Sequence, residues 1–146
     1  MMMTAGRVLS VLLVDDDEGD LLMIQEALDS GGAAHDIHVA HDGEEALQFL
    51  RRQGRYRESP RPDLVLLDLN MPRMDGRQVL AAVKGDVELR QIPVVVLTTS
   101  RAPADIRSSY DLHANAYVTK PMSLDDLTAV VKGIDEFFGG IADLPS

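Results

Sequence analysis

The stretch LVLLDLNMPRMDG, residues 64–76, determines how this chain folds. The apolar residues from Leu64 to Leu67 end directly at Asp68, and a polar turn containing proline leads into a helical pattern at residues 79–83. A short, uninterrupted apolar run is typical of a strand that is covered on both faces of a parallel sheet. The stretch therefore predicts a β-strand, a loop that starts with an acid, and then an α-helix.

The same unit recurs along the whole chain. The predicted strands are Val8–Val14, Asp36–Ala40, Asp63–Leu67, Pro93–Leu97 and Ala116–Val118. Helical patterns separate them, and the last pattern places on one side Leu124, Leu127, Val131, Ile134 and Phe138. Strict alternation of strands and helices predicts a parallel sheet with helices on both faces and right-handed crossovers.

The composition is that of one soluble globular domain. The chain has 146 residues, of which 45% are hydrophobic, and it has no cysteine, which excludes disulfides, thiolate zinc sites and cysteine nucleophiles. Acids outnumber bases by 24 to 14, and the net charge of -10 argues against a nucleic-acid partner. No apolar run approaches the roughly 18 residues of a membrane span, and the N-terminus does not resemble a secretory signal. We therefore expect a cytoplasmic protein with no membrane partner.

Polar residues gather where the predicted strands end. Asp15 and Asp16 follow the first strand, Asp68 the third, Thr98 the fourth and Lys120 the fifth. Ligands of open parallel sheets bind outside these carboxyl ends. Two carboxylates about 4 Å apart repel by roughly 4 kcal/mol at an effective dielectric constant of about 20. A hard divalent cation such as Mg²⁺ relieves this repulsion, whereas the absence of cysteine and of a histidine pair disfavours zinc.

The acids just beyond this pair have a simpler explanation. Asp17, Glu18 and Asp20 are expected to cap the following helix and to interact favourably with its dipole. Only Asp15 and Asp16 of the acidic block are therefore predicted to bind metal.

Asp68 is the candidate reactive group. The preceding apolar run places its backbone rigidly and leaves its carboxylate at the end of the sheet. An aspartate can attack phosphorus and form an acyl phosphate. A metal ion and Lys120 would neutralise the phosphoryl charge, and Thr98 would donate a hydrogen bond to it. The agreement of these strand ends predicts a site that accepts a phosphoryl group.

Several segments together resemble the CheY-like receiver domain of two-component response regulators. They are Val14-Asp15-Asp16, residues 68–76, Val94–Thr98 and Tyr117-Val118-Thr119-Lys120-Pro121. The resemblance covers about Val8 to Phe138 and implies a flavodoxin-like, doubly wound (βα)5 sandwich with a parallel five-stranded sheet of order 2-1-3-4-5. We accordingly expect a flexible tail over residues 1–7, a receiver domain over 8–138 and a C-terminal tail over 139–146.

The resemblance also implies a reaction and a metal site. Asp68 would take a phosphoryl group from the phosphohistidine of a histidine kinase. Mg²⁺ would bind to Asp15, Asp16, Asp68 and the backbone carbonyl of Asn70. A protein of this kind catalyses only its own phosphorylation and dephosphorylation.

Further roles follow from the same resemblance. Lys120 would contact the phosphoryl oxygens, beside a cis peptide bond to Pro121. Thr98 and Tyr117 would form a switch pair, in which the hydroxyl moves toward the phosphoryl group and the aromatic ring turns inward.

A narrower resemblance concerns the partner. The loop Arg51–Pro62, the stretch Leu97–Ser100 and the stretch His113–Tyr117 are similar to stand-alone regulators that are paired with phytochrome-type kinases. This similarity implies a histidine kinase of that type as the partner. No residues remain for a DNA-binding output domain, so we expect the output to be contact with a downstream protein that the sequence does not name.

Other classes of function fit the residues less well. A Mg²⁺-dependent phosphohydrolase with an aspartyl nucleophile needs a second carboxylate two residues later, where this chain has Asn70. A phosphorylation-independent interaction module would be indicated by the loss of Asp68, Lys120 or the acid pair, and all are present. A flavin site needs a neutral, hydroxyl-rich phosphate loop at the position of the acidic block.

Two features leave alternatives open. The loop Arg51–Pro62 carries five arginines, which indicate either a solvated loop that offsets nearby acids or a docking surface for an acidic partner. Phe137 and Phe138 are consistent with core packing and equally with a homodimer contact.

Overall fold

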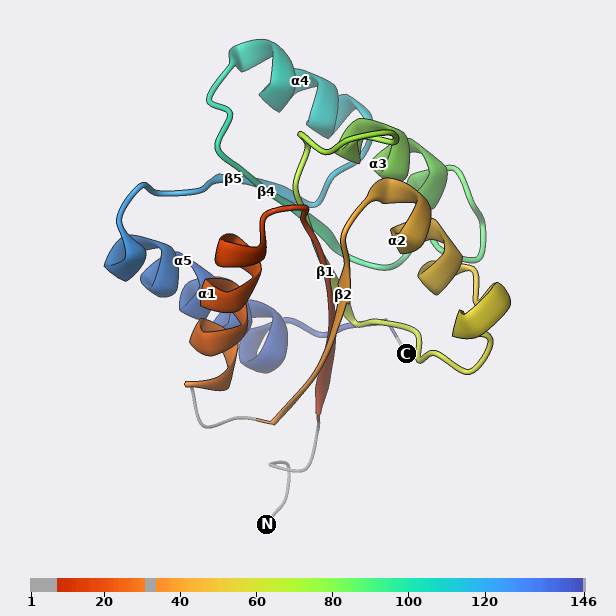
Figure 1. Cartoon of the computed structure of the whole chain (residues 1–146), viewed down its shortest axis with the longest axis horizontal. Coiled ribbons are helices and arrows are strands. Elements are labelled where there is room, and N and C mark those ends of the chain that lie inside the picture. The colour runs from red at the N-terminus through yellow and green to blue at the C-terminus, as the bar shows by residue number, and fades with distance from the viewer. Residues whose placement is uncertain (1–7, 31–33, 146) are drawn as a thin grey trace.

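Five parallel strands form the centre of the molecule in a computed structural model that describes residues 8–30 and 34–145 (Figure 1). They are β1 (Leu9–Val14), β2 (His35–Ala40), β3 (Leu64–Leu67), β4 (Val94–Thr98) and β5 (Ala116–Thr119). Their order is β2-β1-β3-β4-β5 and every neighbouring pair is parallel, which confirms the predicted fold class and strand order. The predicted tail, residues 1–7, lies outside the described residues.

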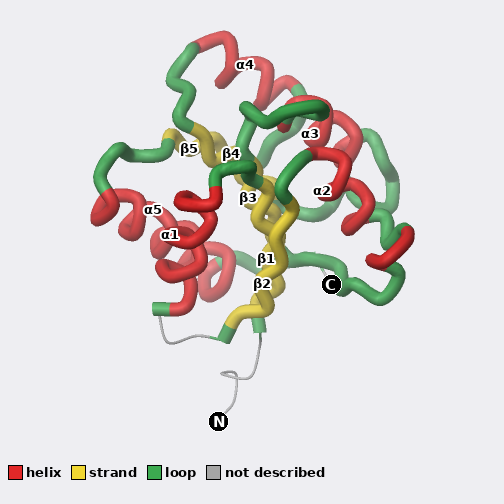
Figure 2. The backbone as a smooth tube through the Cα atoms, viewed as in Figure 1, coloured by secondary structure: helices red, strands yellow, loops and turns green. Residues whose placement is uncertain are grey.

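Helices cover both faces of this sheet (Figures 1 and 2). One face carries α1 (Glu18–Asp29) and α5 (Leu124–Glu136), and the other carries α2 (Gly43–Leu50), α3 (Gly76–Lys84) and α4 (Pro103–Asp111). A short 3-10 turn, Gly54–Tyr56, follows α2, and a π-helical turn, Phe137–Ile141, follows α5. Within residues 8–30 and 34–145, no helix has the length and apolar character needed to cross a membrane.

The central strands are apolar because both of their faces are buried. In β1, Leu12 and Val14 belong to the apolar cluster under α2 and α3, whereas Val11 and Leu13 belong to the cluster under α1 and α5. Successive side chains of a strand point to opposite faces, so a strand between two helical layers has no solvent-facing position. This arrangement explains why the sequence of β1 reads as an almost continuous apolar run.

The last helix differs in part from its predicted apolar face. Leu127 and Val131 are buried and Phe138 packs against the same cluster, as expected, but Leu124 is 53% exposed. Leu124 is the first residue of α5, where the end of the helix is open to solvent. Phe137 is 49% exposed, so core packing accounts for only one residue of the phenylalanine pair.

The residues after α5 form one more helical turn and then pack against the core. The π-helical turn extends past residue 138 to Ile141, and Leu144 packs against the cluster under α1 and α5. The domain limits 8 and 138 remain a prediction.

Gly76 allows the start of α3 to lie directly on the loop that carries Asp68. A β-carbon at position 76 would lie 2.2 Å from the carbonyl oxygen of Asp68 and 2.7 Å from Cα of Leu69. Both neighbours are backbone atoms, so a side chain at this position requires the loop itself to move. The absence of a side chain therefore allows the loop and the helix to lie in direct contact.

We expect Gly76→Ala to lower the free energy of unfolding by about 1–3 kcal/mol, the usual cost of overpacking. Urea denaturation followed by circular dichroism measures this change. Gly133→Ala is the matched control, because apart from its chain neighbours and the backbone of its own helix no described atom lies within 4 Å of its β-carbon position. In the middle of α5 this exchange should raise the free energy of unfolding by about 0.5–1 kcal/mol. Equal effects of the two exchanges would contradict the packing argument.

Candidate functional site

Three carboxylates converge at the carboxyl end of the sheet. The register pairs Val14 with Leu67, so the next residues, Asp15 and Asp68, leave the sheet side by side. Asp15 and Asp68 are only 3% and 8% exposed, and Asp16 is exposed. One oxygen from each of the three carboxylates lies within 4.8 Å of the other two. The structure thus brings together the acids that the sequence singled out.

Lys120 is the cation beside this cluster. Its nitrogen Nζ donates hydrogen bonds to Asp15 Oδ2 at 2.6 Å and to Asp20 Oδ2 at 2.9 Å. It lies 3.7 Å from Asp68 Oδ2. The sequence pattern assigned Asp20 only to the helix terminus and missed this pair. No local signal indicated it, because Asp20 lies in the first turn of α1, where an acid already interacts favourably with the helix dipole.

Burial and charge act in opposite directions on this pair. Burial raises the pKa of Asp15 and outweighs the hydrogen bonds from Lys120 and from the Asp17 amide, which lower it. Burial lowers the pKa of Lys120, but the hydrogen bonds to Asp15 and Asp20 and the charges of Asp15 and Asp68 raise it more. The net result is a raised pKa, so Lys120 is protonated at neutral pH. One ammonium group leaves the surrounding carboxylates with an excess of negative charge.

This set of donors fits a hard divalent cation. Carboxylate oxygens are the ligands that Mg²⁺ and similar ions prefer, and the excess charge beside Lys120 favours a cation. No cysteine or histidine belongs to the described cluster of Asp15, Asp16 and Asp68, which disfavours zinc. Asn70 lies two residues after Asp68 and is itself exposed, between the buried Leu69 and Met71.

Thr98 ends β4, and Tyr117 lies on the neighbouring strand β5, opposite Val96. Thr98 is fully buried, and its hydroxyl oxygen Oγ1 has no hydrogen-bond partner among the described residues. A buried hydroxyl without a partner is costly, so the hydroxyl of Thr98 is free to donate a hydrogen bond. The Tyr117 hydroxyl donates to the backbone carbonyl of Ser100 at 2.9 Å.

The peptide bond before Pro121 is trans, so the expected cis bond is wrong. Within the two described ranges no peptide bond is cis. The trans form remains favoured by about 0.5–1 kcal/mol even before proline, and this bond keeps it. Lys120 is instead positioned through the sheet, because its backbone amide donates to the carbonyl of Thr98 at 2.7 Å.

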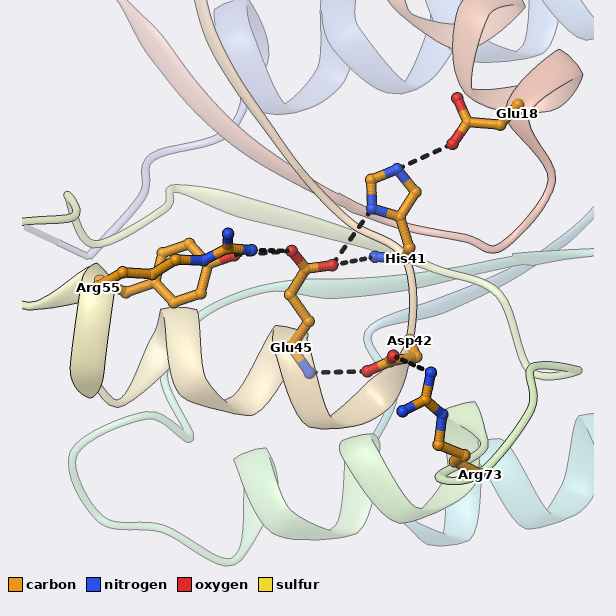
Figure 3. A network of polar contacts seen from close by, with 7 residues as sticks. Glu18, His41, Asp42, Glu45, Arg55 and Arg73 are labelled. Carbon is orange, nitrogen blue, oxygen red and sulfur yellow. Dashed lines mark hydrogen bonds and ion pairs between the residues drawn. The ribbon is translucent and has the colours of Figure 1, made fainter.

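The arginine-rich loop is anchored to α2 through Glu45 (Figure 3). Arg55 Nη2 and the Tyr56 hydroxyl both donate to Glu45 Oε2, at 2.9 and 2.7 Å. The Tyr56 ring also packs edge-on against Phe49, with the ring centroids 5.4 Å apart. The other oxygen, Oε1, accepts a hydrogen bond from the His41 amide at 2.7 Å. Arg55 thus offsets a nearby acid, as the first of the two interpretations of the loop expects, although its side chain remains 74% exposed.

The same network connects the loops around the acidic cluster. His41 Nε2 lies 2.9 Å from Glu18 Oε1 in α1, and Arg73 Nη2 lies 3.5 Å from Asp42 Oδ2 (Figure 3). The loops after β1, β2 and β3 are thereby linked to one another by polar contacts.

The other arginines of the loop Arg51–Pro62 make fewer polar contacts than Arg55. Arg61 donates to the backbone carbonyl of Glu88 at 2.6 Å. With the residues that the structure describes, Arg51, Arg52, Arg57 and Arg61 form no ion pair. Arg51, Arg52 and Arg61 line an open hollow of about 470 Å³ at the amino-terminal edge of the sheet. A docking role of the loop remains a prediction.

Comparison with known proteins agrees with this geometry. The sequence model of the response regulator receiver domain matches residues 11–132. The chain is 46% identical over 136 residues to response regulator Rcp1 of Synechocystis sp., and the match covers 93% of this chain and 92% of that protein.

Two solved structures are similar along almost their whole length. The crystal structure of the phosphorylated cyanobacterial phytochrome response regulator RcpA has a TM-score of 0.93 and 48% identity, covering 96% of this chain and 100% of that chain. The Mn²⁺-bound form of Rcp1 has a TM-score of 0.90 and 46% identity, covering 94% of this chain and 99% of that chain.

Glu45→Gln tests the anchor of the arginine-rich loop. We expect the exchange to lower the free energy of unfolding by about 1–2 kcal/mol at neutral pH, because charge-assisted hydrogen bonds are lost. Burial raises the pKa of Glu45, but hydrogen bonds from the His41 amide and the Tyr56 hydroxyl outweigh it, and the pKa is lowered.

When folding lowers the pKa of a carboxyl group, the charged group stabilises the folded protein at pH values above the pKa that it has in the unfolded chain. This stabilisation is lost as the pH falls through the pKa that the group has in the folded protein. Urea denaturation should therefore show that the difference between wild type and Glu45→Gln shrinks below about pH 4. The control is Glu44→Gln, the exposed neighbour on α2. A difference that stays constant with pH would contradict the assignment to Glu45.

Thermal unfolding in Mg²⁺ tests the predicted metal ligands. At about ten times its dissociation constant, Mg²⁺ should raise the free energy of unfolding by about 1.4 kcal/mol. Asp16→Asn should remove most of this gain. Asp17→Asn makes the same charge change one residue away and keeps a good helix cap, so it should retain the gain. Equal losses in the two variants would argue against Asp16 as a ligand.

Proposed function

Because this chain belongs to the response regulator receiver-domain family, we propose that it accepts a phosphoryl group from a histidine kinase onto Asp68 in a Mg²⁺-dependent reaction. The observation that carries the proposal is the convergence of Asp15, Asp16 and Asp68 within 4.8 Å beside a protonated Lys120. A capping or purely structural role of these acids does not explain why two of them are buried together.

The transfer is a substitution at phosphorus. A carboxylate oxygen of Asp68 forms a bond to phosphorus as the P–N bond to the kinase histidine breaks. The bonding electron pair leaves with the imidazole nitrogen, and the product is an acyl phosphate on Asp68. Bound Mg²⁺ supplies neutralisation of the phosphoryl charge, and its proposed ligands are Asp15, Asp16, Asp68 and the backbone carbonyl of Asn70.

The remaining residues stabilise the transferred group. The ammonium of Lys120 lies 3.7 Å from Asp68 Oδ2, so it faces a phosphoryl group on that oxygen with little displacement. Thr98 donates its hydroxyl to a phosphoryl oxygen and thereby gains the hydrogen bond that it otherwise lacks. Preorganised donors of this kind act strongly in a site with little water.

The same family membership supports a cellular setting and a class of partner for this chain. The chain catalyses only its own phosphorylation and dephosphorylation, in the cytoplasm, and signals through contacts with other proteins. The similarity to proteins named phytochrome response regulators supports a kinase of the phytochrome type as the phosphoryl donor. Homodimerisation through the exposed ring of Phe137 remains a prediction.

Incubation with acetyl phosphate and Mg²⁺ tests the phosphoacceptor. Intact mass spectrometry should detect one added phosphoryl group on the wild-type chain and none on Asp68→Asn, because the amide cannot form the acyl phosphate. A chelator should block the reaction. Asp75→Asn is the matched control in the same loop, where it retains the helix cap, and it should be phosphorylated like wild type. Phosphorylation of Asp68→Asn, or none of the wild type, would refute the proposal.

A further inference from the structure

A chain of polar contacts connects α3 with the loop that follows β4. Arg77 on α3 forms an ion pair with Asp105 Oδ1 in the first turn of α4. The other oxygen, Oδ2, accepts a hydrogen bond from Ser100 Oγ at 2.5 Å. The backbone carbonyl of Ser100 in turn accepts the hydroxyl of Tyr117 at 2.9 Å. One carboxylate therefore joins two helices and a loop to the aromatic ring on β5.

Arg77 and Ser100, two members of this chain of contacts, lie close in sequence to residues of the phosphoacceptor site. Arg77 follows Gly76, where the absence of a side chain lets α3 pack on the backbone of Asp68. Ser100 stands two residues after Thr98, whose buried hydroxyl has no described partner. The contacts thus link the loop of Asp68 to the loop of Thr98 by a route that is separate from the Asp68 side chain.

The central contact, the ion pair between Arg77 and Asp105, is partly shielded from solvent. The Arg77 and Asp105 side chains are only 30% and 24% exposed, so they are screened by water less than an ordinary surface pair. The hydrogen bond from Ser100 and the ion pair with Arg77 lower the pKa of Asp105, which is therefore charged at neutral pH. Its position in the first turn of α4 also interacts favourably with the helix dipole.

We propose that Arg77 and Asp105 are positioning residues that hold Ser100 where its carbonyl accepts the Tyr117 hydroxyl. In this way they favour the arrangement of the loop after β4 in which Thr98 faces a phosphoryl group on Asp68. The inference rests on the proposed function of Asp68. Without the Asp105 carboxylate, the loop and Tyr117 populate other arrangements, and the fraction of molecules that is ready for phosphorylation falls.

Phosphorylation kinetics test this role. The initial rate with acetyl phosphate and Mg²⁺, followed by intact mass, should fall about three- to tenfold in Asp105→Ala, the scale of one lost charge-assisted hydrogen bond. Ser100→Ala should lower the rate similarly, whereas Ser100→Thr keeps the hydroxyl and should remain near wild type. Arg101→Ala is the control for Arg77→Ala, because Arg101 is exposed in the loop after β4 and forms no ion pair with the described residues.

A spectroscopic measurement separates positioning from loss of stability. The chain has three tyrosines and no tryptophan, so labelling with 3-fluorotyrosine gives three fluorine resonances, and Tyr117→Phe identifies one of them. Without any phosphodonor, Asp105→Ala and Arg77→Ala should shift the Tyr117 resonance and leave that of Tyr56 unchanged. A merely structural role would lower the unfolding temperature and leave the Tyr117 resonance in place.

The outcomes are distinguishable. If the residues act through one chain of contacts, the double variant Asp105→Ala, Ser100→Ala should be no slower than either single variant. A wild-type chain that is never phosphorylated would refute the function of Asp68. The positioning role alone would be overturned if Asp105→Ala and Arg77→Ala were phosphorylated as fast as the wild-type chain and the fluorine resonance of Tyr117 did not shift in either variant.

Discussion

The crowding of three carboxylates at the end of an apolar sheet is the constraint on which the rest of this structure depends. Asp15 and Asp68 are held next to each other because the strands before them pair in register and are buried on both faces. Neither backbone can move away to relieve the repulsion. The sheet therefore maintains an electrostatic arrangement that the acids would not adopt by themselves, and Lys120 offsets only part of their charge.

Polar contacts between the surrounding loops support this arrangement. The pairs Glu18–His41 and Asp42–Arg73 connect the loops after β1, β2 and β3, and Arg77–Asp105 extends the connection toward β4. Each pair is partly exposed and contributes modestly on its own. Together they restrict the loops that surround the site, which are positioned by a rigid sheet.

Local patterns were sufficient for much of the fold and of the candidate site. The apolar runs and the helical spacing predicted each strand to within one or two residues at its ends, because parallel strands buried on both faces leave a strong compositional signal. Asp15, Asp16 and Asp68 were found because strand ends of a parallel sheet share one edge. Asp20 was missed, since an acid in the first turn of a helix has an adequate local explanation, and only packing brings it to Lys120.

The sequence by itself determined the order and type of the elements, the edge of the sheet that carries the chemistry, and the residues offered there. Tertiary structure alone decided which polar groups meet. It directs Lys120 to Asp15 and Asp20, Arg55 to Glu45, and Asp105 to both Arg77 and Ser100. The physical reason is that periodicity and burial follow from neighbours along the chain, whereas a hydrogen bond or an ion pair needs distant side chains to lie within about 3–4 Å in a suitable direction.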